Sequence, residues 1–265
     1  MKIAMIGAGA MGGATVDGLI KGSFVNNADI IVSDPFPQER FAKAGVCVTT
    51  DNSEAARKAD IVCVCVKPWL VEEVLKGIRP SLRETSVREN RTAQDTSSKT
   101  LVVIAAGVSS DDIRQWLGDD CPALLLAIPN IAIAELQSMT FLVPVQAQPQ
   151  HTERVKAMFD SMGKTIITDE KHLPSGTALA SCGIAYALRY IRAAAEGGVE
   201  LGFRADDATK IVAQTVKGAI SLLETTGKHP EQLIDQVTTP GGVTIKGLNA
   251  MEEAGFTKAV IKGLV

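Results

Sequence analysis

The residues best suited to chemistry lie together near the end of the chain. Gly241 and Gly242 have no Cβ atoms, so a ligand can approach the backbone closely at this point. Val243 and Thr244 follow, and Thr244 would place a hydroxyl group in the first turn of a helix. The free N–H groups and the positive dipole end of a helix suit a carboxylate. These four residues are therefore a candidate site for a substrate with a carboxylate group.

The sequence on both sides of this site predicts the helix itself. Thr238 and Thr239 are candidate caps, and Pro240 suits the start of a helix. Apolar residues then recur at helical spacing, at Ile245, Leu248 and Met251. The alternative for this stretch is a capped helix that has no part in binding.

A second candidate site is a glycine-rich loop at the beginning of the chain. Residues 7–12 have the pattern G-x-G-x-x-G after a predicted strand and at the start of a predicted helix, the context that dinucleotide binding requires. Gly7 permits the tight turn, Gly9 lets the pyrophosphate approach the backbone, and Gly12 lets the helix pack on the strand. An ordinary glycine-rich turn is the alternative. The predicted cofactor contacts are Ile6, Gly7, Ala8, Gly9, Ala10, Met11 and Gly12.

The end of the second predicted strand should contact the ribose of the adenosine. Ser33 and Asp34 lie there, with Asp34 about 20 residues beyond Gly12. A carboxylate at this point accepts hydrogen bonds from the ribose 2′- and 3′-hydroxyls and repels a 2′-phosphate. No arginine follows until Arg40. These residues favour NADH over NADPH, and a mere helix cap is the alternative role of Asp34.

The sites require a scaffold, and the first part of the chain predicts a parallel α/β sheet of the Rossmann type. A helix is predicted from about residue 10 to residue 21. The predicted strands are residues 2–6, 30–33, 61–66, 101–105 and 123–128, with 141–143 and 165–167 as further candidates. The polar segment 83–99 interrupts this pattern, and we expect an exposed insertion there, with a functional lid as the alternative. We assign residues 1–168 to this dinucleotide-binding domain.

Residues 169–265 are predicted to form an all-helical domain. One helix carries the apolar spacing of residues 184–195 and should end at Gly197 and Gly198. A second long helix should end at Gly227. The excess apolar surface of these helices predicts pairing with another copy of the chain. Apolar residues on more than one helix face include Val199, Leu201 and Ile220.

The composition excludes several classes of function. The chain of 265 residues has 27 basic and 30 acidic residues, so we expect no basic face for nucleic acid. No apolar run reaches the roughly 18 residues of a transmembrane helix, so no membrane partner is predicted. The apolar start of the chain is too short for a signal peptide.

The cysteines and histidines show no spacing typical of metal sites or disulfides. The five cysteines are an odd number without C-x-x-C spacing, which predicts neither a disulfide framework nor a zinc site. Cys63 and Cys65 should face the same side of one strand as small buried side chains, and a reducing cytoplasm fits this usage. We assign no catalytic role to His151 and His172, in polar sequence surroundings, or to His229, before a proline at a helix start.

The stretch from Val237 to Phe256 resembles the C-terminal signature of pyrroline-5-carboxylate reductases. Those enzymes carry Ser/Thr-Ser/Thr-Pro-Gly-Gly-Thr/Ala-Thr-Ile and then a helix that ends near Glu-x-x-Gly-Phe. The resemblance covers nearly the whole chain apart from residues 83–99. It implies NAD(P)H-dependent hydride transfer to the imine carbon of Δ1-pyrroline-5-carboxylate, which gives proline in the last step of proline biosynthesis. It also implies a homodimer, or a larger oligomer of dimers, with interlocked helical domains.

The resemblance implies roles for individual residues. The hydroxyl group of Thr244 would contact the ring nitrogen of the substrate and assist its protonation. Members that prefer NADPH tend to carry Ser, Thr, Asn or Arg at the position of Asp34, and the family as a whole leans toward NADPH, so both cofactors stay open. Without the resemblance, Lys67 would be an exposed lysine at a strand end. The residues that match family cofactor contacts are Asn52 near the adenosine, Val66, Lys67 and Pro68 after the fourth strand, and Ala105 and Ala106 beside the nicotinamide.

The chain also departs from the family motifs. Leu126 and Ile131 replace the arginine and the threonine of Arg-x-Met-Pro-Asn-Thr-Pro. Ala180 and Cys182 replace both serines of Ser-Gly-Ser-Gly-Pro-Ala-Tyr. Val243 stands where the signature has threonine or alanine. These changes surround the substrate pocket of the family, so altered substrate preference, weakened catalysis and neutral drift are all open.

Two other functions are open. One is a reductase of the same architecture that acts on another small imine or on a 3-hydroxy acid. The 3-hydroxy acid would require a catalytic lysine in the first long C-terminal helix, where Arg189 and Arg192 occur but no lysine follows Lys171. The other is a catalytically idle paralogue that binds a dinucleotide as a sensor or interaction partner.

Overall fold

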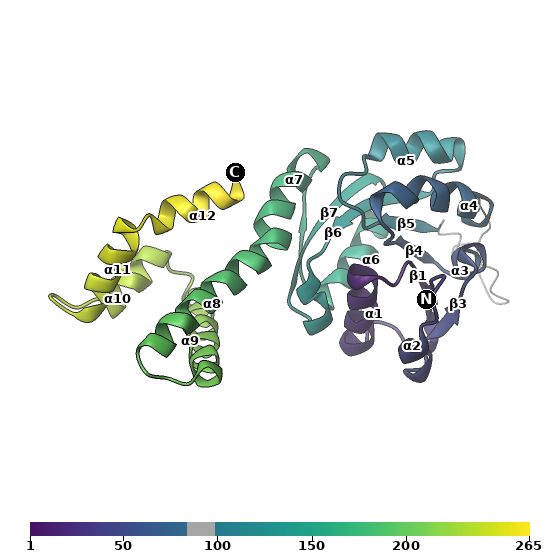
Figure 1. Ribbon diagram of the computed structural model, residues 1–265. Helices are drawn as coiled ribbons and strands as arrows, with labels where there is room; N and C mark the ends of the chain where they lie inside the picture. The colour runs from purple at the N-terminus through teal and green to yellow at the C-terminus, as the bar shows by residue number, and fades with distance from the viewer. Residues whose placement is uncertain (84–98) are drawn as a thin grey trace. The chain divides into compact units, whose positions relative to one another are not determined.

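The computed structural model describes residues 1–83 and 99–265, which divide into two compact units, residues 1–181 and 182–265 (Figure 1). The first unit is a helix-flanked sheet and the second is helical, so the predicted fold class is confirmed. The boundary that we placed after residue 168 stays a prediction.

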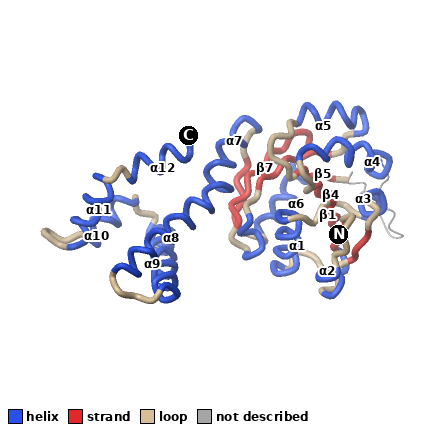
Figure 2. Tube along the Cα trace, in the orientation of Figure 1, coloured by secondary structure: helices blue, strands red, loops and turns tan. Residues whose placement is uncertain are grey.

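The first unit is built on one sheet of eight strands in the order β3-β2-β1-β4-β5-β6-β7-β8. The strands are β1 (Ile3–Ile6), β2 (Ile30–Ser33), β3 (Cys47–Thr49), β4 (Ile61–Val64), β5 (Thr100–Val103), β6 (Ala123–Ile128), β7 (Ser138–Gln146) and β8 (Gly163–Ile167). Figure 2 shows these strands in red between the helices. The order reverses between β1 and β4, and ligands of such sheets bind beyond the carboxyl ends of the strands at this reversal.

The sequence had predicted a parallel sheet, but the observed sheet is not parallel throughout. Strands β1 to β6 run parallel, whereas β7 pairs with β6 in the antiparallel direction, and β8 runs parallel to β7. A parallel crossover needs about a dozen residues or more, usually with a helix. Only a short 3-10 turn, Ile131–Glu135, is assigned between β6 and β7, so the chain turns back on itself there.

Helices cover both faces of this sheet. They are α1 (Ala10–Gly22), α2 (Glu39–Lys43), α3 (Asn52–Lys58), α4 (Val71–Arg83), α5 (Ser110–Leu117), α6 (Pro149–Asp160) and the short α7 (Leu173–Gly176). One apolar cluster lies against α1 and α6 and the other against α3, α4 and α5. Alternate residues of β1, β2, β4, β5 and β6 enter opposite clusters, which explains the continuous apolar runs in the sequence.

Several predicted bounds need correction. Strand β4 ends at Val64 rather than at residue 66, and β5 ends at Val103 rather than at residue 105. The short strand β3 was not predicted, because three mostly exposed residues give no clear pattern. Strand β7 is longer than the predicted 141–143.

The predicted insertion at residues 83–99 lies almost entirely outside the described residues. Its two ends belong to the ordered fold: Arg83 is exposed as predicted but is helical, and the prediction that Lys99 is exposed is wrong. Arg83 is the last residue of α4. Lys99 is buried, and its Nζ atom donates hydrogen bonds to the carbonyl oxygens of Ala56, in the last turn of α3, and of Ala59, its C-cap.

Cys63 and Cys65 are buried in the same apolar cluster, as predicted. Burial raises the pKa of the Cys65 thiol to about 12 and that of Cys63 further. Both thiols therefore stay protonated at neutral pH and act as small apolar side chains.

The second unit consists of α8 (Gly183–Glu200), α9 (Ala205–Thr226), α10 (Pro230–Val237), α11 (Val243–Glu253) and α12 (Phe256–Leu264). Gly227 ends α9 in the left-handed conformation, with φ of 62°, as predicted. The prediction that Gly197 and Gly198 end α8 is wrong, because α8 continues to Glu200. Gly198 instead lets α9 approach, since an added Cβ atom would lie 2.9 Å from the Cβ atom of Ala208.

This contact gives a matched pair of substitutions. We expect Gly198→Ala to lower the free energy of unfolding by about 1–2 kcal/mol, because the methyl group overpacks the contact with Ala208. Gly197→Ala meets no atom within 4 Å and should raise it by about 0.5–1 kcal/mol through helix propensity. Urea denaturation of both variants measures these changes. Equal effects of the two substitutions would contradict this role of Gly198.

Apolar side chains are exposed over several helices of the second unit. Leu201 is 81% exposed, and Val199 and Ile220 are about half exposed, as the sequence had predicted. Such a surface is typical of a segment that packs against a partner. None of the helices in the described part of the chain combines the length and the apolarity that a membrane span needs.

Candidate functional site

The glycine loop between β1 and α1 has the geometry of a dinucleotide site. Gly7 has φ of 93°, and an added Cβ atom there would lie 2.6 Å from the carbonyl oxygen of Cys65. An added Cβ atom at Gly12 would lie 2.0 Å from the carbonyl oxygen of Gly7. Both positions therefore require glycine, because any side chain would collide with the backbone.

Gly9 differs from these two glycines because no atom lies within 4 Å of its added Cβ atom. It is the N-cap of α1 and has ordinary dihedral angles, so the fold itself does not demand glycine there. Gly9 and Ala10 are exposed, while Ala8 and Met11 are half-buried. The loop thus presents open backbone and a helix N-terminus, which fit the pyrophosphate of a dinucleotide.

Asp34 is tied to this loop. Its Oδ2 atom accepts a hydrogen bond of 2.7 Å from the N–H group of Ala8, and Oδ1 accepts one of 2.9 Å from Phe36. Asp34 is not a helix cap, because α2 begins at Glu39 and its N-cap is Gln38. The helix-cap alternative is therefore wrong. The carboxylate lies where it would contact the ribose next to a bound pyrophosphate.

Two more residues predicted to lie near the adenosine contact each other. The Oγ atom of Ser33 donates a hydrogen bond of 2.7 Å to Oδ1 of Asn52, the first residue of α3. Arg40, the nearest arginine after Asp34, is engaged elsewhere, since its Nη1 atom contacts both carboxylate oxygens of Asp17 on α1. The guanidinium of Arg40 is therefore already paired with an acid.

The other predicted cofactor contacts lie at the carboxyl ends of β4 and β5. Val66 is half-buried and Lys67 is exposed, and Pro68 begins a 3-10 turn. Ala105 and Ala106 follow β5. Since β1, β2, β4 and β5 are neighbours in the sheet, these residues lie along the same edge as the glycine loop.

The predicted substrate residues lie in the second unit, at the start of α11. The predicted caps need correction: α11 begins at Val243 with Gly242 as its N-cap, and Thr238 instead closes α10. An added Cβ atom at Gly242 would lie 2.4 Å from Oγ1 of Thr239. No side chain caps α11, so its first N–H groups are available to a ligand.

Thr244 is the second residue of α11, as predicted, and is half-buried. Within the described part of the chain its hydroxyl group forms no hydrogen bond. Val243 beside it is 87% exposed. The hydroxyl group and the free N–H groups thus lie together at one helix end, an arrangement that suits a ligand with a carboxylate.

The motif departures have distinct structural settings. Leu126 is buried in β6, and Ile131 is about half exposed in the turn that follows. Asn130, which the family motif retains, donates from Nδ2 to the carbonyl oxygen of Ala180 at 3.3 Å. This contact uses the backbone of Ala180, so the loss of a serine side chain there leaves it intact. Cys182 is exposed.

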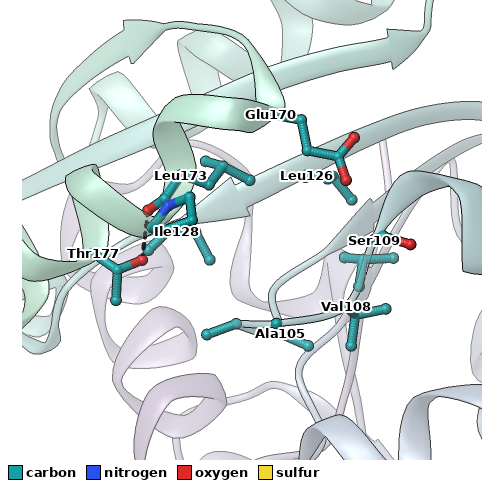
Figure 3. Close-up of a pocket in the computed structure, with 12 residues that line it drawn as sticks. Ala105, Val108, Ser109, Leu126, Ile128, Glu170, Leu173 and Thr177 are labelled. Atoms are coloured by element: carbon teal, nitrogen blue, oxygen red, sulfur yellow. Dashed lines mark hydrogen bonds between the residues drawn. The ribbon is translucent and has the colours of Figure 1, made fainter.

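A cavity of about 470 Å³ opens beside Ala105 and Ala106 (Figure 3). It is lined by Val103, Ala105, Ala106, Gly107, Val108, Ser109, Leu126, Ile128, Glu170, Leu173, Pro174 and Thr177. Sequence reasoning missed Glu170, because it lies in a short polar stretch that resembles an ordinary surface turn. Its Oε1 atom accepts a hydrogen bond of 2.8 Å from the N–H group of Ser110 at the start of α5.

The three histidines have different structural settings. His151 is buried on α6, which corrects the prediction of polar surroundings, and burial together with Arg154 lowers its pKa. The Nδ1 atom of His172 lies 2.6 Å from Oδ1 of Asp169. His229 forms a capping box at the start of α10.

Two different family models match separate parts of the chain. The family model "Pyrroline-5-carboxylate reductase dimerisation" matches residues 170–265. The model "NADP oxidoreductase coenzyme F420-dependent" matches residues 2–87, which include the glycine loop and Asp34.

Individual relatives match over the full chain. Pyrroline-5-carboxylate reductase 1 of Dictyostelium discoideum is 38% identical over 99% of this chain, which spans about half (48%) of that longer protein. Pyrroline-5-carboxylate reductase 2 of the same organism is 33% identical, over 100% of this chain and 90% of the relative. The crystal structure of 1-pyrroline-5-carboxylate reductase from Streptococcus pyogenes is 31% identical, with a TM-score of 0.81 over 100% of this chain and 95% of that one. The chain therefore belongs to the pyrroline-5-carboxylate reductase family.

Proposed function

We propose that this chain reduces Δ1-pyrroline-5-carboxylate to proline with NAD(P)H. The observation that carries the proposal is the start of α11, where the signature stretch leaves uncapped N–H groups beside the free hydroxyl group of Thr244. The chain matches members of the family over its full length, which supports the same substrate. The open space at Gly9 supports the cofactor, because a pyrophosphate can approach the backbone there.

The reaction needs orientation more than acid–base strength. A bound reduced nicotinamide supplies a hydride to the imine carbon. The protonated ring nitrogen of the substrate is already an electrophile, so it takes up the electron pair of the C=N bond and becomes the amine of proline. The protein has to orient the substrate ring toward the nicotinamide, bind the substrate carboxylate and exclude water. This accounts for a site without a catalytic histidine.

The start of α11 supplies these functions in the proposal. The N–H groups of Gly241, Val243 and Thr244 hold the substrate carboxylate beside Gly242, assisted by the helix dipole. The N–H group of Gly242 itself donates to the carbonyl oxygen of Thr239 at 2.9 Å. The hydroxyl oxygen of Thr244 accepts a hydrogen bond from the protonated ring nitrogen and keeps its proton in place during hydride transfer. Asn52, Val66, Lys67, Pro68, Ala105 and Ala106 border the cofactor.

Asp34 sets the cofactor preference in this proposal. Its carboxylate is held by Ala8 and Phe36 close to the ribose position, and Arg40 is paired with Asp17. A 2′-phosphate would meet a fixed negative charge without a free cation beside it. NADH is therefore the preferred cofactor, although the family as a whole leans toward NADPH.

We expect Asp34→Asn to shift the ratio of the dissociation constants for NADH and NADPH about tenfold toward NADPH. The substitution removes the charge and keeps the shape, and its Oδ1 atom can still accept from Ala8. Titration of both cofactors by fluorescence measures the ratio. Asp29→Asn, at the opposite end of β2 from Asp34, is the control and should leave the ratio unchanged. An unchanged ratio in Asp34→Asn would remove this residue from cofactor discrimination.

We also propose that the chain forms homodimers through its second unit. The exposed apolar side chains of α8 and α9, such as Leu201, support this, as does the match to a dimerisation domain. Light scattering at micromolar concentration tests it, and a monomer would count against it. The cytoplasmic location predicted from cysteine usage stays a prediction.

The decisive test of function is oxidation of NADH and NADPH, followed by absorbance, with Δ1-pyrroline-5-carboxylate as substrate. Rapid turnover supports the proposal, and the ratio of the two rates reports on Asp34. Folded protein that binds cofactor but does not turn over would instead favour another small imine or an idle dinucleotide-binding paralogue. The replacement of arginine by the buried Leu126 is the structural reason to test a panel of cyclic imines next.

A further inference from the structure

The two most exposed aromatic side chains of the described residues are Phe36 and Trp69, which are 73% and 75% exposed. Phe36 follows β2 and Trp69 follows β4, so both lie at the carboxyl edge of the sheet. The other aromatic side chains that the structure describes in the first unit are buried or half-buried. Two exposed aromatic rings at the sheet edge where ligands bind indicate a surface that a ligand covers.

The backbone holds both aromatic residues in place. Phe36 lies between two prolines, whose rings restrict the backbone, and its N–H group donates to Oδ1 of Asp34 at 2.9 Å. Trp69 lies in a 3-10 turn that is closed by a hydrogen bond of 2.9 Å from the N–H group of Leu70 to the carbonyl oxygen of Lys67. Since the backbone of both residues is fixed before a ligand arrives, binding costs little ordering of these loops.

The sheet register sets the spacing between the two loops. Ser33, the last residue of β2, and Val64, the last residue of β4, both pair with Ile6 of β1. Neighbouring strands lie about 4.8 Å apart, so these two strand ends are about 10 Å from each other. Aromatic rings in contact have centroids about 4.5–7 Å apart, so two such contacts in a row span roughly 9–14 Å. A flat heteroaromatic ring therefore fits between side chains that follow these two strands.

The proposed ribose contact lies next to this space. Asp34, which is proposed to bind the ribose of the adenosine, stands two residues before Phe36 and is fixed to the glycine loop through Ala8. The adenosine ribose carries the pyrophosphate on one side and adenine on the other. With the pyrophosphate over the glycine loop and the ribose on Asp34, the adenine extends to the sheet edge where the loops after β2 and β4 lie.

We propose that Phe36 and Trp69 bind the adenine ring of the cofactor between them by stacking. This assignment rests on the proposed function, to which it adds two residues that recognise the base. Stacking on an aromatic side chain contributes affinity for any base with an exposed ring face. The aromatic pair, Phe36 and Trp69, therefore strengthens the binding of NADH and NADPH alike, whereas Asp34 distinguishes between the two cofactors.

Tryptophan fluorescence provides the first test. The chain has two tryptophans, so Trp116→Phe leaves Trp69 as the reporter, and Trp116 packs on the apolar cluster of α3, α4 and α5, away from the aromatic pair. The probe is ADP, which carries adenine, ribose and pyrophosphate without the nicotinamide. We expect ADP to quench the emission of Trp69 with the same dissociation constant that calorimetry gives, and nicotinamide mononucleotide to leave the emission unchanged. Binding of ADP without any change in this emission would overturn the proposal.

Variants of the aromatic pair provide the second test. Phe36→Ala and Trp69→Ala should each weaken the binding of ADP, NADH and NADPH about tenfold, as the loss of one stacking contact predicts. Phe36→Tyr and Trp69→Phe keep an aromatic ring and should bind within about twofold of the unmodified chain. Leu70→Ala truncates an exposed apolar side chain of the same turn and is the control. Since all three side chains are exposed, the melting temperatures should stay unchanged, and full ADP affinity in both alanine variants of the pair would contradict the assignment.

The binding of ADP requires no turnover, so this test separates the aromatic pair from the proposed reaction. Quenching of Trp69 by ADP in a protein that does not reduce Δ1-pyrroline-5-carboxylate would support the pair and count against the reaction. In a protein that does turn over, Trp69→Ala should raise KM for NADH about tenfold and leave kcat unchanged, because stacking of the base is the same in the ground state and the transition state. Turnover with an unchanged KM would overturn the role of the pair alone, and folded protein that binds neither ADP nor NADH would overturn both proposals.

Discussion

Replacing Thr244 by alanine should lower the turnover of Δ1-pyrroline-5-carboxylate at least about a hundredfold, a typical contribution of a positioned proton donor or acceptor. Its hydroxyl group is half-buried at the start of α11 and has no partner in the described residues, so it is available to a ligand. Dissociation constants for NADH and NADPH should stay within about twofold, because cofactor binding is assigned to the first unit. Single-turnover kinetics and cofactor titration measure the two effects separately.

The chain offers a matched control for this variant. Thr257 is the second residue of α12, so Thr257→Ala removes a threonine hydroxyl from the same position of another helix. Its hydroxyl group already donates to Oε2 of Glu252 at 2.7 Å. This variant should keep its turnover. If Thr244→Ala and Thr257→Ala behave alike, Thr244 has no special part in the reaction.

The second large effect separates two glycines of the same motif. Gly12→Ala should lower the free energy of unfolding by about 1–3 kcal/mol or more, because the new Cβ atom would lie 2.0 Å from the backbone oxygen of Gly7. Gly9→Ala should leave stability within about 0.5 kcal/mol, since nothing lies within 4 Å of its new methyl group. Gly9→Ala should nevertheless weaken cofactor binding at least about tenfold, because the methyl group takes the space of the pyrophosphate.

Thermal unfolding without cofactor, followed by titration with NADH, measures both consequences. Gly9→Ala is its own control for folding, because its melting temperature should match that of the unmodified chain. Full cofactor affinity in that variant would show that the pyrophosphate does not pass over Gly9. A fully stable Gly12→Ala would mean that α1 can shift away from Gly7 at little cost.

The family departures have different expected consequences because their settings differ. Asn130 contacts the backbone oxygen of Ala180, so the missing serine hydroxyl does not disturb that contact. Leu126, in contrast, lines a cavity that also contains the carboxylate of Glu170. The replacement of arginine by leucine thus changes the charge of a space next to predicted cofactor contacts, and it is the departure most able to change ligand preference.

The sequence by itself determined those features that depend on neighbours along the chain. The glycine pattern with its flanking apolar run predicted the β1–α1 loop, and β2 and β6 have the predicted bounds. The family followed from the resemblance of residues 237–256 to a known signature. The Rossmann-type class and the helical second part followed from such local patterns. They are readable because strand and helix periodicity and glycine stereochemistry act over a few residues.

The tertiary structure decided what depends on contacts between distant residues. Only the fold shows that Asp34 is bound to Ala8 rather than capping a helix, and that Gly198 serves the approach of Ala208 rather than a helix end. Only the fold reverses β7 against β6 and brings Glu170 to Ser110 beside Leu126. Hydrogen bonds and packing between segments far apart in the chain leave no periodic signal, so no local pattern could have predicted these features.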